Sequence, residues 1–188
     1  MTTSRIRKDA ARNWQHIVDT ARRFVDEGED LRLNDVARAA SIGVATVYRH
    51  FPTSEALLET LARPRLEGLV AFADRAATGD DAWEGFAGFL LAGVEAQVTD
   101  ASLPPVLATD KHALPETTEL VTRLFSATGQ LLDHARAAGA VRSGVTHEDI
   151  VRLMCGVAFA AGVHALPDER AALTRRYLNI TLTGIRVH

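Results

Sequence analysis

The sequence predicts an all-α protein of about nine helices. Apolar residues recur at intervals of three and four positions along most of the chain, as they do on the buried face of an α-helix. No stretch shows the alternation of apolar and polar residues that a half-buried strand requires, and no repeat or low-complexity tract is present. The length of 188 residues allows a small domain and a larger one, each with a buried core.

The first predicted helix covers residues 9–27 and ends at Gly28. Its apolar face consists of Trp14, Ile17, Val18, Ala21, Phe24 and Val25. Basic residues gather at and before its start, namely Arg5, Arg7, Lys8 and Arg12. Two interpretations of this basic segment stay open. It is either a flexible arm that follows a phosphate backbone or enters a minor groove, or a solvated chain end.

Two short helices joined by a tight turn follow within residues 36–58. The first is rich in alanine and ends at Ala40, and the second covers Val44 to Phe51 and is stopped by Pro52. This arrangement is typical of a helix-turn-helix motif. Because turns of small residues also join helices in many bundles, the residue types on the second helix decide the interpretation.

The second of these helices has two chemically different faces. Val47 and Phe51 lie four residues apart and are expected to point inward. The opposite face carries Ala45, Thr46, Arg49 and His50. An arginine can form two hydrogen bonds with a guanine edge, and small apolar side chains can contact thymine methyl groups. Thr46, Tyr48 and His50 can donate hydrogen bonds to phosphates, so the helix suits the major groove of DNA.

The run from Ala37 to Leu58, A-x-x-A-x-x-x-x-x-T-V-Y-R-H-F-P-T-x-E-A-L-L, resembles the signature of the tetracycline-repressor (TetR) family of bacterial regulators. The matching positions are Thr46, Tyr48, His50, Phe51 and Glu55-Ala56-Leu57. The resemblance covers residues 10–63 well and residues 131–153 more loosely.

This resemblance implies an N-terminal three-helix DNA-binding domain, residues 1–55, and a larger helical domain for effector binding and dimerisation, residues 56–188. The candidate DNA-contacting residues are Arg32, Val44, Ala45, Thr46, Tyr48, Arg49, His50 and Ser54. The implied function is a ligand-responsive repressor that binds palindromic, double-stranded operator DNA. A constitutive DNA-binding protein without a ligand is the alternative, and a helical enzyme is a remote one.

Three positions depart from the family's pattern. Ser41 stands where the turn usually has glycine, so a residue with a side chain must adopt the turn geometry. Ser54 replaces a basic residue, usually lysine, and one phosphate contact is therefore expected to be missing. Arg32 occupies the place of a capping serine or threonine, which leaves Asn34 or Asp35 to cap the first motif helix.

A connecting helix is predicted to begin after Thr53, its N-cap, and to extend to about Ala77. Pro64 lies inside it and predicts a kink or break near Ala62. Beyond this helix the pattern stays helical, except for a loop at residues 99–116 with room for one short helix.

The last two predicted helices cover residues 147–164 and 168–186, and Thr146 with Asp149 forms a capping box at the start of the first. A single recognition helix buries too little surface for tight specific binding, and two-fold proteins contact half-sites about 34–36 Å apart. We therefore expect a homodimer in which these two helices pair with their symmetry mates as a four-helix bundle.

Aromatic side chains on several predicted helices suggest an apolar effector pocket, although the same residues fit an ordinary core. The candidate pocket residues are Trp83, Phe86, Phe89, His112, Phe125, Met154, Phe159 and His164. Since they offer few charges, the predicted effector is small and mainly apolar, with His112 or His164 supplying one hydrogen bond.

Other classes of function find little support. No apolar run approaches the ~18 residues of a membrane span and no apolar segment follows the N-terminal basic residues, so a cytoplasmic protein is expected. The single cysteine, Cys155, excludes an intrachain disulfide and is expected to be a core thiol. We find no metal-ligand set, cofactor motif or catalytic motif, and the net charge of −3 argues against a wholly basic surface.

Overall fold

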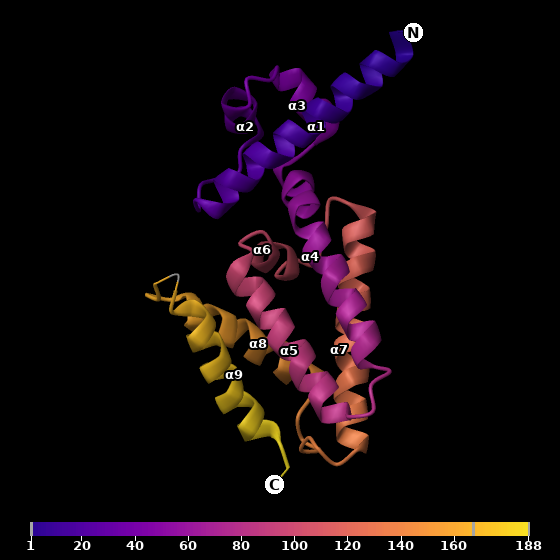
Figure 1. Ribbon diagram of the computed structural model, residues 1–188, viewed down its shortest axis with the longest axis vertical. Helices are drawn as coiled ribbons and strands as arrows, with labels where there is room; N and C mark the ends of the chain where they lie inside the picture. Colours follow the sequence, from indigo (N-terminus) through magenta and orange to yellow (C-terminus); the bar gives the residue numbers. More distant parts are fainter. Residues whose placement is uncertain (1, 167, 188) are drawn as a thin grey trace. The chain divides into compact units, whose positions relative to one another are not determined.

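The computed structural model describes residues 2–166 and 168–187, and within them the regular secondary structure consists of helices and one isolated β-bridge (Figure 1). The helices are α1 (Thr2–Asp26), α2 (Leu33–Ala39), α3 (Val44–His50), α4 (Ser54–Ala76), α5 (Ala82–Thr99), α6 (Leu103–Leu107), α7 (Pro115–Ala137), α8 (His147–Gly162) and α9 (Arg170–Ile185). The predicted all-α class is confirmed, and so is the short helix in the 99–116 loop.

The chain forms two compact units. Unit 1 consists of the described residues up to Pro64 together with Ala101–Thr118. Unit 2 consists of Arg65–Asp100 and the described residues from Glu119 onward. Both α4 and α7 therefore contribute residues to each unit.

Unit 1 has a hydrophobic core built from α1, α2, α3 and the start of α4. Its buried members are Ile17, Ala21, Val25, Leu33, Val36, Ala37, Val47, Phe51, Leu57 and Leu61. These residues share one face on each helix, which is the pattern expected for an amphipathic helix against a core. Trp14 is 37% exposed, and its ring centroid lies 6.2 Å from that of Phe51.

The structure differs from the prediction at the start of the first helix and at Pro64. The first helix begins at Thr2 instead of residue 9, so the backbone of the basic segment is helical; side chains up to Lys8 lie outside the described ones. Of the kink or break predicted near Ala62, the break does not occur, since α4 continues through Pro64. The kink stays a prediction. Proline removes the N–H that would bond the Thr60 carbonyl, and its ring crowds that carbonyl. Burial of Ala62 and Leu66, both 0% exposed, holds the helix on either side.

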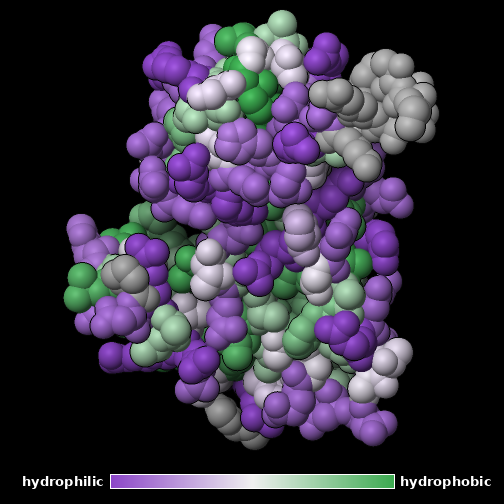
Figure 2. Space-filling view, turned by 45° about the horizontal axis from the view of Figure 1, so that its top comes forward, coloured by the Kyte–Doolittle hydropathy of each residue, from purple (hydrophilic) through white to green (hydrophobic). Residues whose placement is uncertain are grey.

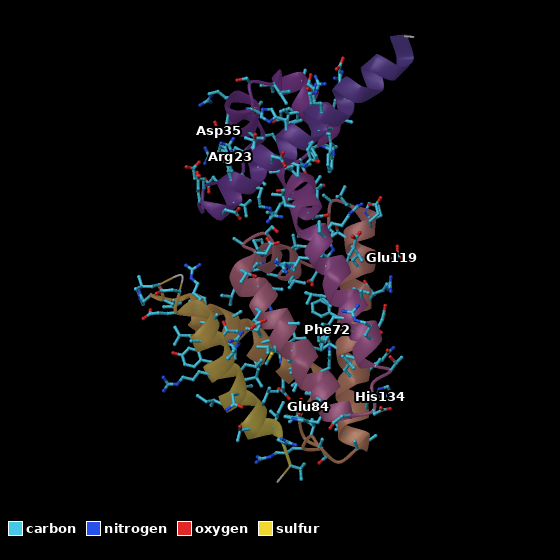
Figure 3. All side chains as sticks on the ribbon, viewed as in Figure 1. Arg23, Asp35, Phe72, Glu84, Glu119 and His134 are labelled. Carbon is cyan, nitrogen blue, oxygen red and sulfur yellow. The ribbon has the colours of Figure 1, made fainter. Side chains whose placement is uncertain are left out.

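Unit 2 is a helical bundle in which α5, α8 and α9 pack against one another. The Phe72 ring of α4 lies 6.4 Å from the Phe89 ring of α5, in the space between the two helices (Figure 3). Arg123 of α7 forms an exposed ion pair with Asp74 of α4 at 3.4 Å. The C-terminal segment closes the bundle through the β-bridge between Val141 and Arg186.

The predicted capping box at the start of α8 is confirmed. The Thr146 hydroxyl accepts the Asp149 backbone N–H at 3.1 Å, and the Asp149 carboxylate accepts the Thr146 backbone N–H at 2.9 Å. The Thr146 hydroxyl also donates to this carboxylate at 2.7 Å. These bonds, that of the hydroxyl first, lower the pKa of Asp149 below its usual value.

The outward faces of α8 and α9 carry large apolar side chains. Phe159 is 75% exposed, Leu166 after α8 is 61% exposed and Ile180 of α9 is 60% exposed. Figure 2 shows that the surface on the face it presents is mostly hydrophilic, with hydrophobic patches between the hydrophilic side chains. The prediction that Cys155 is a core thiol was wrong: it is exposed, because α8 buries the face that carries Met154 and Val157.

Candidate nucleic-acid interface

The turn between α2 and α3 ends α2 with a specific hydrogen-bond pattern. Ser41 N–H donates to the Arg38 carbonyl at 3.1 Å, and Ile42 N–H donates to the Ala37 carbonyl at 3.0 Å. This pair of bonds is a Schellman motif, which places the residue after the C-cap in the left-handed region. That residue is Ser41, with φ of 53°. The turn therefore has the geometry that glycine usually provides, as the departure at this position predicted.

Helix α3 is oriented by two apolar side chains. Val47 is 0% exposed, and Phe51, the C-cap, is 3% exposed. Both belong to the core of unit 1, as the spacing of the sequence predicted. Since these two residues point inward, the opposite side of α3 faces solvent.

The solvent-facing side of α3, here called the recognition face, consists of Val44, Ala45, Thr46, Tyr48, Arg49 and His50. Val44 and Tyr48 are each 46% exposed, and Arg49 is also exposed. Thr46 and His50 are half-buried. Among the described residues, Arg49 has no hydrogen-bond or ion-pair partner, so its guanidinium is available to another molecule.

The residues that flank this face have defined local roles. Thr53 is the predicted N-cap of α4, and its hydroxyl accepts the Ala56 N–H at 3.1 Å. Ser54, half-buried, is the first residue of α4. Arg32 is the N-cap of α2, but no side chain caps that helix, so the predicted capping by Asn34 or Asp35 was wrong.

The charged side chains around α2 pair with one another. Asp35 forms an ion pair with Arg38 at 3.0 Å, and Arg32 pairs with Asp30 at 2.9 Å. The Asp35 carboxylate is thus bonded to Arg38 and not to a backbone N–H at the start of α2. All four side chains are on the surface, where such pairs contribute little to stability.

Two family models match the chain. The one described as "Bacterial regulatory proteins, tetR family" matches residues 17–61, which include the recognition face. The one described as "Transcriptional regulator SbtR-like, C-terminal domain" matches residues 81–187, which are more than half of the chain. The chain belongs to the TetR family.

Individual proteins agree with this assignment. An HTH-type transcriptional regulator of Staphylococcus aureus is 34% identical over 58 residues, a match that spans 29% of this chain and only 30% of that regulator. A TetR transcriptional regulator from Streptomyces coelicolor is 29% identical, with a TM-score of 0.58 over 92% of this chain and 98% of its own. The transcriptional regulator FadR from Bacillus subtilis, solved with stearoyl-CoA, shares the fold at 16% identity, with a TM-score of 0.67 over 92% of this chain and 99% of its own.

In this TetR-family protein, unit 2 contains five of the eight predicted pocket residues in partly or fully buried positions. Trp83, Phe86 and Phe89 are at most 9% exposed on α5, and Met154 of α8 is 7% exposed. Phe125 of α7 is half-buried.

The ring of Phe125 stands edge-on to that of His147 at 6.3 Å. The Nε2 atom of His147 is buried and has no hydrogen-bond partner among the described residues. Trp83 faces the C-terminal end of α9, where the Arg186 guanidinium lies 4.7 Å above its ring.

The remaining three predicted pocket residues lie elsewhere. Phe159 is 75% exposed on the outward face of α8, and His164 is exposed beyond the end of that helix with φ of 55°. Neither is enclosed by its own chain. His112 belongs to unit 1, where its Nε2 donates to the Val106 carbonyl at 3.1 Å and its Nδ1 lies 3.4 Å from the Thr118 hydroxyl.

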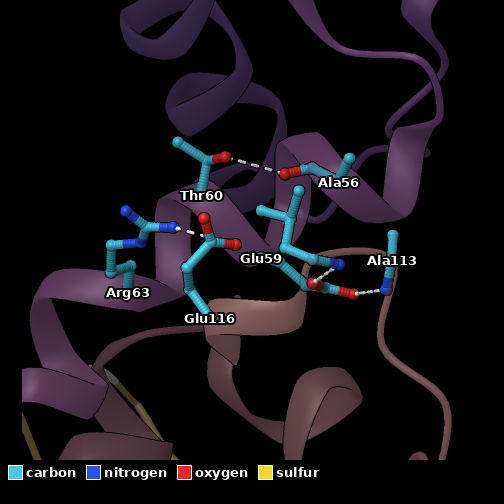
Figure 4. Close-up of polar contacts among 7 residues, drawn as sticks. Ala56, Glu59, Thr60, Arg63, Ala113 and Glu116 are labelled. Atoms are coloured by element: carbon cyan, nitrogen blue, oxygen red, sulfur yellow. Dashed lines mark hydrogen bonds and ion pairs between the residues drawn. The ribbon is translucent and has the colours of Figure 1, made fainter. Parts of the chain in front are cut away.

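Sequence reasoning missed a buried carboxylate in unit 1. Glu59 of α4 is 3% exposed, and its two oxygens accept the backbone N–H groups of Ala113 and Leu114 at 2.6 and 2.9 Å (Figure 4). Nothing in the sequence marks this residue, because its partners are backbone groups more than 50 positions away.

Among residues 2–166 and 168–187, no group of three or more histidine, cysteine, aspartate or glutamate side chains is arranged to hold a metal ion. Over the same residues, no helix combines the length and the apolar character needed to cross a membrane.

Proposed function

We propose that this TetR-family transcriptional regulator is a ligand-responsive repressor that binds a palindromic operator as a homodimer. The observation that carries the proposal is the recognition face of α3, where an exposed, unpaired Arg49 stands among small and hydroxyl-bearing side chains. A guanidinium of this kind can form two hydrogen bonds with a guanine edge. Thr46, Tyr48, His50 and the flanking Arg32 and Ser54 would contact phosphates, while Val44 and Ala45 would meet base methyl groups.

Dimerisation is supported by the surface of α8 and α9. Leu153, Phe159 and Ile180 are 40%, 75% and 60% exposed, which is unusual for large apolar side chains on two adjacent helices. Pairing of residues 147–164 and 168–186 with their symmetry mates would remove this surface from water and place two recognition faces on one duplex. A palindromic operator follows from the two-fold axis.

An effector site is proposed in residues 56–188, with DNA binding assigned to residues 1–55. The buried aromatic rings of α5 and Phe125 of α7 favour a small, mainly apolar ligand. FadR of Bacillus subtilis, which has the same fold, was solved with stearoyl-CoA, a molecule with a long apolar chain. The ligand would lower DNA affinity by binding better to the conformation that does not fit the operator. In this proposal the protein is no enzyme and acts in the cytoplasm.

The test is selection of binding sites from a random pool of duplexes, followed by affinity measurement. We expect a palindrome, and we expect Arg49→Ala to cost about 1–3 kcal/mol and to relax preference at one position of each half-site. Unchanged affinity and preference in the Arg49→Ala protein would contradict the orientation assigned to α3.

A panel of apolar, cationic and anionic compounds, screened by thermal stabilisation and then by release of the selected duplex, tests induction. We expect stabilising compounds to be apolar and to release the DNA. If none stabilises the protein, a constitutive DNA-binding protein is the better description. If compounds stabilise it without releasing DNA, induction as proposed is wrong.

A further inference from the structure

The Glu59 carboxylate caps a helix to which it does not belong. Its oxygens accept the N–H groups of Ala113 and Leu114, immediately before the first residue of α7, Pro115. A helix N-terminus favours a negative charge, and two N–H donors compensate for the loss of water around a buried carboxylate. The carboxylate therefore binds the start of α7 to the second turn of α4 (Figure 4).

Two further contacts hold the 101–118 segment to the α1 and α4 helices. Arg22 of α1 donates to the Leu61 carbonyl of α4 at 2.6 Å and to the hydroxyl of Ser102 at 3.4 Å, and Ser102 is 0% exposed. Arg63 of α4 lies 3.9 Å from Glu116. The segment is thus attached near its beginning, at Ser102, and near its end, at residues 113–116.

The family comparison assigns the same segment differently. The C-terminal family model covers residues 81–187 and so includes 101–118, whereas the structure places 101–118 in unit 1 with the recognition face. Two side chains that precede Pro64 bond to this segment: Glu59 accepts the Ala113 N–H, and Arg22 donates to the Ser102 hydroxyl.

We propose that Glu59 is a positioning residue that makes the 101–118 segment and helices α1–α3 open and close as one cooperative unit, so that the conformation of this segment sets the affinity of the recognition face for DNA. The DNA part of this statement rests on the proposed function. The physical reason is that elements joined by buried, charge-assisted hydrogen bonds share one opening equilibrium. Since α7 continues beyond Thr118 into unit 2, a conformational change in that part of α7 would be transmitted to α3 through Glu59.

The first test is hydrogen exchange of the full-length protein without DNA, comparing Glu59→Gln with Glu67→Gln. Glu67 is an exposed glutamate on the same helix, so its substitution makes the same change in charge. We expect Glu59→Gln to accelerate exchange about 10-fold in residues 113–118 and equally in α2 and α3, with α5 and α8 unchanged. Acceleration confined to residues 113–118 would overturn the proposal, and so would equal acceleration in α5 and α8, which would signal global unfolding.

If Glu59→Gln does not fold, Ser102→Ala provides the second variant, because it removes the Arg22 contact at the other end of the segment. It should accelerate exchange in the same residues about 3-fold. Unchanged exchange in α2 and α3 of this variant would also refute the coupling.

The second test uses the duplex selected as described above. Relative to Glu67→Gln, Glu59→Gln should bind it about 10-fold more weakly while remaining folded at the assay temperature. Equal binding by the two variants would show that the segment does not set affinity. If the wild-type protein selects no duplex, the proposed function fails, whereas the exchange experiment still decides the coupling.

Discussion

Replacement of Ser41 by glycine should make the protein more stable. In the part of the chain that the structure describes, three helices end in the same pair of backbone hydrogen bonds, and in two of them the left-handed residue is glycine: Gly28 with φ of 71° and Gly139 with φ of 72°. The third is Ser41, with φ of 53°. An L-residue with a Cβ atom pays a steric penalty in this region that glycine does not.

The magnitude follows from two opposing effects. The left-handed conformation costs a residue with a side chain about 1–2 kcal/mol. Glycine loses about 0.5–1 kcal/mol more backbone entropy on folding. The net gain for Ser41→Gly is therefore about 0.5–1 kcal/mol, which for a protein of this size raises Tm by roughly 1–4 °C.

The assay is urea and thermal denaturation of the wild-type protein, Ser41→Gly and Ser126→Gly. Ser126 is an exposed residue in the interior of α7, where the same substitution should destabilise by about 0.5 kcal/mol because glycine is a poorer helix former. Opposite signs for the two variants would support the argument. Destabilisation by Ser41→Gly would refute it, since the Cβ atom would then contribute more through packing than it costs through the backbone.

Three other perturbations follow from the structure. Phe159→Asp places a charge in the proposed dimer interface, so the variant should be a monomer at micromolar concentration when its mass is measured by light scattering. A variant that is still a dimer would contradict that interface. Asp149→Asn should lower the stability of unit 2 at neutral pH, where the Asp149 carboxylate is ionised. Because the pKa of Asp149 is lower in the folded than in the unfolded chain, the stability that its charge contributes is lost as the pH falls from about 4 through the folded-state pKa, and the difference between variant and wild type should shrink over that range. A difference that does not shrink as the pH falls would exclude a charge effect. Tyr48→Phe and His50→Ala should each lower the affinity for the selected duplex and for a scrambled duplex by the same factor, because phosphate contacts do not depend on sequence. A loss of affinity for the selected duplex alone would indicate that the side chain contacts a base.

The orientation of α3 could be predicted from the sequence because two local patterns agree. Val47 and Phe51 repeat at helical spacing, and Pro52 fixes where the helix stops. Both residues are in the core of unit 1. The Thr146–Asp149 capping box was equally accessible, since all its bonds lie within four consecutive residues.

Features that depend on distant parts of the chain could not be predicted in this way. Glu59 is indistinguishable in sequence from a solvated glutamate on a helix, since its partners are backbone N–H groups that every sequence provides. Cys155 and Phe159 lie in an apolar helix, and the sequence alone did not separate the face that packs on α5 and α9 from the face that points outward. His112 was assigned by residue type to an effector pocket, but its ring nitrogens face groups of its own segment.

The division of the chain into two units affects the design of chimeras between regulators of this family. A chimera joined at Pro64 would take helices α1–α3 from one parent and the 101–118 segment from the other. Glu59 and Arg22 would then face a loop from the other parent, and its backbone N–H groups and hydroxyl need not lie within hydrogen-bond distance of these side chains. A graft intended to change the operator while keeping the response should therefore move two pieces of sequence together, the residues up to Pro64 and Ala101–Thr118.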